Sequence, residues 1–330
     1  MKVNDPTFNF SEEYALEVDT TCRQLALEEY HKMIDKYLPA LKRYSETKET
    51  GRSGFEKLHQ NFVDYFKIAT IFYSIFDEKL NSKIEKYIQG GNIVPFEPND
   101  KRGENKVVLE DDKSVKIYLA PQDSMMGYLS IVQTLAYSLS QKYQKGKRPN
   151  LDYLYRIEGI FAQKIFIDCL RDSGLVTNVG YQSLCGKLNS SFEKNVNILL
   201  EERELFKELK TPIRAQDLLN YALSHEDDPD LKQKMARLEK LRGVSADFPS
   251  NNGRHAFKCV LGTVVADVLY DDYKQDKKKT MKRFRKYLNH SSDFERIEDV
   301  FEVLLGKDYA KKLNDKVLSG GKDWDQERSF

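Results

Sequence analysis

Residues 131–140 read Ile131-Val132-Gln133-Thr134-Leu135-Ala136-Tyr137-Ser138-Leu139-Ser140. The apolar side chains of this stretch return every three or four residues, which is the period of one face of an α-helix. Gln133 and Tyr137 stand four residues apart, so a helix places them one turn apart on the other side. The sequence therefore predicts a helix that is buried along one side and presents an amide and a phenol as neighbours along the other.

The spacing of Gln133 and Tyr137 is that of the two metal ligands on a zinc-peptidase helix. Such an enzyme needs two histidines one turn apart, so that both imidazoles face one metal ion, in the motif His-Glu-x-x-His. The glutamate beside the first histidine is the general base toward the metal-bound water. This chain has Gln133 and Tyr137 in the ligand positions and Thr134 in the position of the base. Gln is a poor zinc ligand and Tyr an uncommon one, so we expect no metal and no catalysis here.

Glu158 stands in the next helical segment, in unusually apolar surroundings. Its neighbours in the sequence include Tyr155, Ile157 and Phe161. An unpaired charge in such a place is costly, so this carboxylate needs a partner or a proton. Our hypothesis is that Gln133 and Tyr137 satisfy Glu158 by hydrogen bonds, since an amide and a phenol can both donate to a carboxylate.

A short β-element precedes these helices. Residues 106–110 and 113–120 flank Asp111-Asp112 and read as a β-hairpin, and residues 92–96 are also β-like. In the second strand, Val115, Ile117 and Leu119 alternate with polar residues and predict one buried face. We expect this strand, Val115–Leu119, to line a binding site and to pair with an extended peptide by edge addition.

The rest of the chain is predicted to be helical, which makes the fold class mainly α with a small β-hairpin or sheet. The apolar periodicity predicts helices over residues 11–47, 53–88, 123–144, 152–173, 180–209, 214–224, 229–241, 254–275, 277–288, 293–305 and 307–318. We divide the chain into an N-terminal helical region (1–100), a main domain (101–318) and a flexible tail (319–330).

In their order, these segments resemble the catalytic half of the thimet oligopeptidase and oligoendopeptidase F family, which are gluzincin metallopeptidases. The resemblance lies in the strand Val115–Leu119, the helix 131–140, the Glu158 helix and the later stretch Ala256–Ala266, and it extends over residues 110–318. It implies a multi-helix, zincin-like oligopeptidase fold. The chain is about half as long as members of that family usually are, and a chance similarity between helical patterns is the alternative explanation.

Carried over residue by residue, the resemblance leaves the family's zinc site incomplete. Glu158 matches the glutamate that completes that site, and Gly262 matches a glycine of the late substrate-binding helix. Phe257 and Cys259 stand where tyrosines are usual. Of the five histidines, only His255 stands near this late helix. The resemblance therefore implies a pseudoenzyme that has the family's fold and lacks the His-Glu-x-x-His motif.

These observations predict a non-catalytic protein that binds a peptide or another protein in the former substrate cleft. We expect no cofactor and no metal, and a binding site made of Gln133, Tyr137, Glu158, Phe257, Cys259 and His255. Two alternatives stay open at this point. The first is a residual peptide hydrolase that is zinc-independent or assisted by a partner. The second is an interaction protein that contacts nucleic acid through the basic run 277–286.

Charge and cysteine usage limit the other classes of function. With 53 basic and 52 acidic residues, the chain has no overall attraction for nucleic acid or for an anionic membrane. Phe284 and Leu288 give the basic run an apolar side, which favours a solvated helix face over a nucleic-acid site. The four cysteines are far apart, and no apolar run reaches the ~20 residues that cross a bilayer. We expect a cytoplasmic protein with no membrane partner; its oligomeric state stays open.

Overall fold

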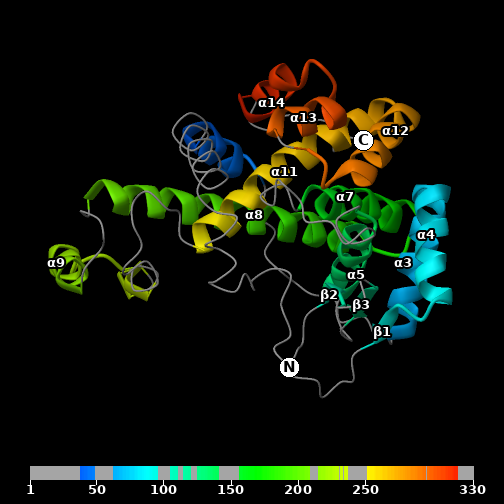
Figure 1. The fold of residues 1–330 in the computed structure, drawn as a ribbon. Helices are drawn as coiled ribbons and strands as arrows, with labels where there is room; N and C mark the ends of the chain where they lie inside the picture. The colour runs from blue at the N-terminus through cyan, green and yellow to red at the C-terminus, as the bar shows by residue number, and fades with distance from the viewer. Residues whose placement is uncertain are drawn as a thin grey trace.

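The computed structural model shows a mostly helical protein with one three-stranded sheet (Figure 1). It describes residues 38–48, 62–95, 105–110, 114–119, 125–140, 156–208, 215–229, 231–232, 234–236, 251–294 and 296–318. Besides a helix at 38–46, its elements are α3 (Phe62–Phe76), α4 (Glu78–Gln89), β1 (Ile93–Pro95), β2 (Lys106–Leu109), β3 (Val115–Leu119), α5 (Met125–Ser138), α7 (Ile157–Asp172), α8 (Asn178–Glu208), α9 (Ala215–Ser224), α11 (Asn251–Gln275), α12 (Lys277–His290), α13 (Ile297–Leu305) and α14 (Tyr309–Leu318). None of the helices in these ranges is long and apolar enough to span a bilayer.

The predicted fold class is confirmed, and most of the predicted helices are present within a few residues of their expected ends. The prediction of one helix over 53–88 is wrong in its described part, because the helix is interrupted at Asp77, between α3 and α4. There the Asp77 side chain accepts hydrogen bonds from the backbone amides of Lys79 and Leu80 and caps the start of α4. A carboxylate that satisfies free amides in this way favours a new helix start over a continuous helix.

The predicted hairpin is confirmed, but β3 lies in the middle of the sheet. The strand order is β1-β3-β2, with β2 antiparallel and β1 parallel to β3. Val115, Ile117 and Leu119 are buried, as their alternation predicted. Edge addition of a peptide to Val115–Leu119 is therefore a wrong prediction, because the backbone groups on both sides of β3 already pair with β1 and β2.

Helix α7 is the centre of the core. Thirteen of its 16 residues are buried, so almost no side of it meets solvent. An aromatic cluster joins α7 to the elements before and after it: Phe72 and Phe76 of α3 pack against Phe166 and Phe161, and Phe161 also packs against Phe284 of α12. Side chains from both sides of residue 100 thus share one hydrophobic core, and the division of the chain at residue 100 stays a prediction.

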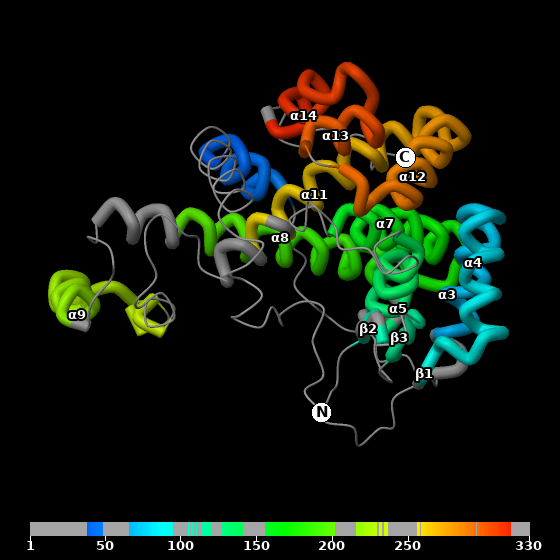
Figure 2. Tube along the Cα trace, in the orientation of Figure 1, coloured from blue at the N-terminus to red at the C-terminus, as the bar shows by residue number. Residues whose placement is uncertain are grey.

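The long helices α8 and α11 cross at the centre of the molecule and pack against each other and against α7 (Figure 2). The sheet lies beside α5, α3 packs against α4 and α5, and α12, α13 and α14 gather at one end of α11. Helix α9 lies apart from this body in both views. This arrangement brings α12 to the same place as α5 and α7, which precede it by more than 100 residues in the sequence.

Candidate functional site

Helix α5 is held in place by side chains from three other helices. The hydroxyl of Tyr73 on α3 donates to the carbonyl of Val132 at 2.8 Å, and the hydroxyl of Tyr87 on α4 donates to the carbonyl of Ser138 at 2.9 Å. The amide of Gln163 on α7 donates to the carbonyl of Leu129 at 3.1 Å. These bonds fix where α5 presents its polar side chains.

Gln133 and Tyr137 are neighbours on α5, as the four-residue spacing predicted. The Nε2 group of Gln133 donates to the Tyr137 hydroxyl at 2.7 Å. Both side chains lie against Gly159 of α7: a Cβ atom on residue 159 would stand 2.6 Å from Cγ of Gln133 and 2.7 Å from Cε1 of Tyr137. Such distances are shorter than van der Waals contact, so only glycine lets α7 approach these two side chains this closely.

Glu158 lies beside this contact and is 1% exposed. Its carboxylate accepts a hydrogen bond from the hydroxyl of Tyr287 on α12 at 3.2 Å. The expectation that a carboxylate in this setting needs a partner is therefore met by Tyr287. A direct hydrogen bond from Gln133 or Tyr137 to Glu158 stays a prediction.

The electrostatics of Tyr287 agree with this geometry. Burial raises the pKa of the Tyr287 phenol well above its usual value of 10.0, and the nearby Glu158 carboxylate and Tyr137 phenol raise that pKa further. Tyr287 therefore keeps its proton at any physiological pH and remains a hydrogen-bond donor to Glu158. The pKa of Tyr287 thus responds to both Glu158 and Tyr137.

Thr134 on α5 and the predicted site residues Phe257 and Cys259 on α11 lie in the protein interior. Thr134 is 3% exposed, and its hydroxyl donates to the carbonyl of Ser130 at 2.8 Å. Phe257 and Cys259 on α11 are also buried, and the side chain of His255 lies outside the described part of the chain. A role for these three α11 residues in binding stays a prediction.

Gly262 is the point where α11 approaches the start of α7. A Cβ atom on residue 262 would stand 3.2 Å from Cβ of Arg156 and 3.4 Å from the backbone nitrogen of Ile157. Glycine therefore allows close helix packing here, at the two residues just before Glu158. The residue that matched the family's late glycine has a packing role in this chain.

The donor groups at this site do not fit a zinc ion. Gln133 offers a neutral amide that already donates to Tyr137, and Glu158 accepts from Tyr287. Zinc sites in proteins use thiolates, imidazoles and carboxylates, and of these the described side chains around Gln133 and Tyr137 offer the Glu158 carboxylate. Within the ranges that the structure describes, no three histidine, cysteine, aspartate or glutamate side chains are grouped so that they could hold a metal ion.

Sequence reasoning missed two residues of the site, Gly159 and Tyr287. A glycine inside a buried helix lowers helix stability and often marks a close approach, so Gly159 could have been found from its position beside Glu158. Tyr287 is 129 residues from Glu158 and stands in a strongly basic helix. No local signal connects these two residues, because the contact depends on how α12 packs on α7.

A second polar cluster lies further along α7, around Asp267 of α11. The fully buried Asp267 carboxylate accepts from the hydroxyl of Tyr44 at 2.6 Å and pairs with Lys48 at 2.8 Å and with Lys164 at 2.5 Å. Although burial alone would raise it, the pKa of Asp267 is held well below its usual value, mainly by the ammonium groups of Lys164 and Lys48. This network ties residues 38–48 to α7 and α11.

Asp168 forms a similar group one turn after Lys164. Its carboxylate accepts from the hydroxyls of Tyr270 and Tyr181 and pairs with Lys274 at 3.1 Å. Burial raises the pKa of the Tyr270 phenol, and the Asp168 charge raises it further. These contacts join α7, α8 and α11, so we assign the group to helix packing.

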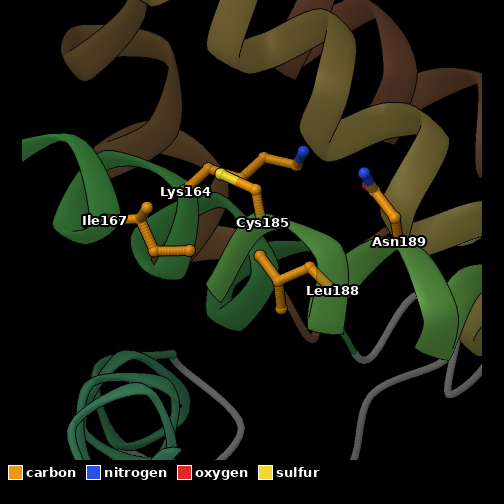
Figure 3. Close-up of a pocket in the computed structure, with 5 residues that line it drawn as sticks. All are labelled: Lys164, Ile167, Cys185, Leu188 and Asn189. Atoms are coloured by element: carbon orange, nitrogen blue, oxygen red, sulfur yellow. The ribbon is translucent and has the colours of Figure 1, made fainter. Parts of the chain in front are cut away.

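A small pocket opens beside these clusters, between α7 and α8 (Figure 3). Lys164 and Ile167 of α7 and Cys185, Leu188 and Asn189 of α8 line about 240 Å³ of space, which includes its open mouth. The buried ammonium of Lys164 is already paired with Asp267. None of the lining residues belongs to the predicted binding set, and the space is too small for a peptide.

Comparisons with known proteins agree on the fold. No known sequence family matches the chain, and no curated protein sequence matches it. Among solved structures, it is similar to a protein identified as an oligoendopeptidase F from Bacillus anthracis, with 10% identity and a TM-score of 0.60 over 96% of this chain and 58% of that one. It is also similar to PZ peptidase A solved with an inhibitor, with 11% identity and a TM-score of 0.56 over 92% of this chain and 59% of that one.

A third similar structure is a peptidase from Chlamydophila abortus, with 11% identity and a TM-score of 0.51 over 92% of this chain and 55% of that one. The chain thus spans between half and two thirds of the length of these proteins. At such low identity the likeness concerns the fold, and it matches the resemblance found in the sequence. The protein has the fold of the oligoendopeptidase F and PZ peptidase structures.

Proposed function

We propose that the protein is a non-catalytic relative of these peptidases and binds a peptide or an extended protein segment on the surface formed by α5 and the sheet. The observation that carries the proposal is the hydrogen bond between Gln133 and Tyr137 over Gly159. In the resembling family the two positions hold zinc-binding histidines. Here they form an amide–phenol pair packed on α7, and the neighbouring Glu158 is bound by Tyr287.

The described sheet has two edge strands, β1 and β2, and we assign the peptide to β2 because β2 lies against α5. Within the described part of the sheet, β2 pairs with β3 on one side only. Just before β2, the amide of Asn105 donates to the hydroxyl of Ser130 on α5 at 2.7 Å. Ser130, Gln133 and Tyr137 are half-buried and share one face of α5. A strand added to β2 would therefore run beside polar groups able to bond its side chains or backbone.

The test measures binding and cleavage with the same substrates. The metal content of the purified protein is measured first. The protein is then mixed with a set of unstructured peptides, of which one labelled form reports binding by fluorescence anisotropy and another reports cleavage by loss of quenching. We expect saturable binding of part of the set, no cleavage, and no effect of a chelator. Hydrogen–deuterium exchange with a bound peptide should show slower exchange in β2, since added strand pairing protects backbone amides.

Variants test whether peptide binding depends on the proposed surface. Gln133→Leu combined with Tyr137→Phe removes the polar pair, and we expect it to weaken peptide binding by roughly tenfold, the size of one or two lost hydrogen bonds. Tyr181→Phe is the matched control, because it removes one half-buried hydroxyl on α8 that bonds Asp168. Equal affinity in the two variants, or cleavage that a chelator abolishes, would contradict the proposal.

A further inference from the structure

The outer face of α12 carries a row of lysines. Lys278, Lys282 and Lys286 are exposed and stand four residues apart, with Lys279 exposed beside them. The opposite face of the same helix is buried and includes Phe284, Leu288 and the Tyr287 that bonds Glu158. We call the three lysines at four-residue spacing the lysine row. It spans about 12 Å along the helix axis, because each residue adds about 1.5 Å.

Two carboxylates near α12 pair with its arginines. Arg285 pairs with Asp77, and Arg283 pairs with Asp272 at 2.5 Å. Asp272 also pairs with Lys312 at 2.9 Å. In the part of the chain that the structure describes, the lysine row has no ion-pair partner. The row is therefore a local excess of positive charge on a chain whose net charge is only +1.

The neighbouring helix adds to this charge. Lys83 of α4 donates to the side chain of Asn289 at 3.0 Å, and this bond, together with the Arg285–Asp77 pair, places α4 alongside α12. Lys79 and Lys86 of α4 are exposed. Against the three lysines of α4 stand two glutamates, Glu78 and Glu85, so α4 adds a net charge of +1.

The size and make-up of the surface point to one kind of partner. Proteins that hold nucleic acid commonly neutralise ~6–10 phosphates, which needs a longer basic surface than the lysine row offers. An acidic segment of a protein fits better, because carboxylates four residues apart on a helix repeat at the same distance as the lysines. Complementary charge of this kind guides association and fixes the register of the two partners.

We propose that the lysine row on α12 is a docking surface for an acidic helical segment of a partner protein, separate from the peptide-binding surface on α5. Docking there covers the outer face of α12 and leaves the hydrogen bond from Tyr287 to Glu158 on the inner face unchanged. The inference does not depend on the proposed function, since it rests on the charges of α12 and α4 alone.

The experiment uses the full chain and a defined probe. The probe is a fluorescein-labelled helical peptide of roughly four turns with a glutamate at every fourth position, and its control is the same peptide with glutamine at those positions. Binding is measured by anisotropy at low ionic strength and at about 0.15 M salt. A carbodiimide that joins carboxylates to amines, followed by mass spectrometry, locates the probe. We expect binding of the glutamate peptide only, weakening with salt, and cross-links concentrated at Lys278, Lys282 and Lys286.

Matched variants test the location. Lys278→Glu with Lys282→Glu and Lys286→Glu reverses the row, and should weaken binding by roughly tenfold, because each exposed pair contributes little and three are changed together. The control reverses the exposed Lys194, Lys232 and Lys307, which changes net charge equally at other places. It should stay within about twofold of the unchanged protein. Circular dichroism confirms that both variants are folded.

Three results would overturn the inference. The first is no binding of the glutamate peptide by the unchanged protein at low salt. The second is an equal loss in the two triple variants, or cross-links spread evenly over exposed lysines, since either would indicate a general charge effect. The third is tighter binding of single-stranded RNA or duplex DNA than of the peptide at the same salt, which would assign the surface to nucleic acid.

Discussion

The hydroxyl of Tyr287 lies 3.2 Å from a carboxylate oxygen of Glu158, and 129 residues separate the two along the chain. Both side chains are buried, so neither has water as an alternative partner. This contact links α12 to α7 at the carboxylate that the sequence resemblance predicts to correspond to a zinc ligand. A hydrogen bond from Tyr287 also offsets part of the cost of burying the Glu158 carboxylate at this position.

Tyr287→Phe tests the value of that contact. The change leaves the ring in place and removes the donor, so we expect a loss of about 1–3 kcal/mol in the free energy of unfolding, the cost of a buried acceptor that has lost a partner. Denaturant titration measures it. Tyr309→Phe is the control, because Tyr309 is half-buried on α14 and its hydroxyl has no hydrogen bond to another described residue. If Tyr287→Phe lowers the free energy of unfolding by less than Tyr309→Phe does, the role given to Tyr287 is wrong.

Gly159→Ala tests the close approach of α7 to α5. Alanine favours a helix over glycine by about 1 kcal/mol, so without a clash the change would stabilise the protein. The added Cβ would stand 2.6 Å from Gln133 and 2.7 Å from Tyr137, and we expect overpacking to cost about 1–3 kcal/mol instead. The same change in a chain that also carries Gln133→Ala and Tyr137→Ala should be neutral or stabilising by up to about 1 kcal/mol, because the clashing atoms are gone. A similar loss in both chains would place the strain elsewhere.

Asp267→Asn tests the buried charges that tie residues 38–48 to the core. The change keeps the shape of the side chain and leaves Lys48 and Lys164 without their common counter-charge. We expect a loss of about 3–5 kcal/mol, which is typical when one partner of a buried ion pair is removed. Thermal and denaturant unfolding measure it. Asp315→Asn is the control, because Asp315 is an exposed residue of α14 that pairs with Lys311. We expect it to change stability by less than about 1 kcal/mol.

Lys48 gives the stability a dependence on alkaline pH. Burial lowers the pKa of its ammonium from 10.5 to about 8, with Lys164 and Lys316 lowering it further against the attraction of Asp267. Between pH 8 and 10.5 the unfolded chain therefore holds more protons at this group than the folded chain does. Stability from this group rises with pH wherever the unfolded state binds more protons.

We therefore compare the protein with its Lys48→Met variant across that range. At pH 7 we expect the variant to lose little stability, because Asp267 keeps Lys164 as its counter-charge and the lowered pKa of Lys48 means that folding disfavours its charged form. As the pH rises through the window, the unchanged protein should gain on the variant by about 1–3 kcal/mol, at about 1.4 kcal/mol per unit of pKa. Exposed Lys307→Met is the control and should show no such change. A difference that stays constant with pH would contradict the assignment to Lys48.

Gln133→His with Tyr137→His tests whether the metal-site geometry survives. The two imidazoles would stand one turn apart beside Glu158, so we expect the variant to take up one zinc ion per chain. Equilibrium dialysis followed by metal analysis measures it. Adding Glu158→Gln should weaken the binding markedly, because it removes the only carboxylate ligand. A folded double variant that binds no zinc would show that these side chains no longer converge.

Much of the local structure could be read from the sequence. The periodicity of apolar residues placed α5, α7, α8 and the helices after them close to their observed positions, and the alternation of Val115, Ile117 and Leu119 gave the buried face of β3. The four-residue spacing of Gln133 and Tyr137 correctly made them neighbours. These features depend on residues close together in the chain, so a local pattern is enough to predict them.

The sequence alone indicated that Glu158 is a buried carboxylate in need of a partner, because a charge in an apolar segment has few alternatives. Three other features are visible only in the folded chain: Tyr287 is a partner of Glu158, β3 lies between two other strands, and residues 38–48 and α7 place two lysines and a tyrosine around Asp267. Each of these depends on which distant segments pack together. That choice is made by the shape and burial of the whole core, and no short stretch of the chain contains it.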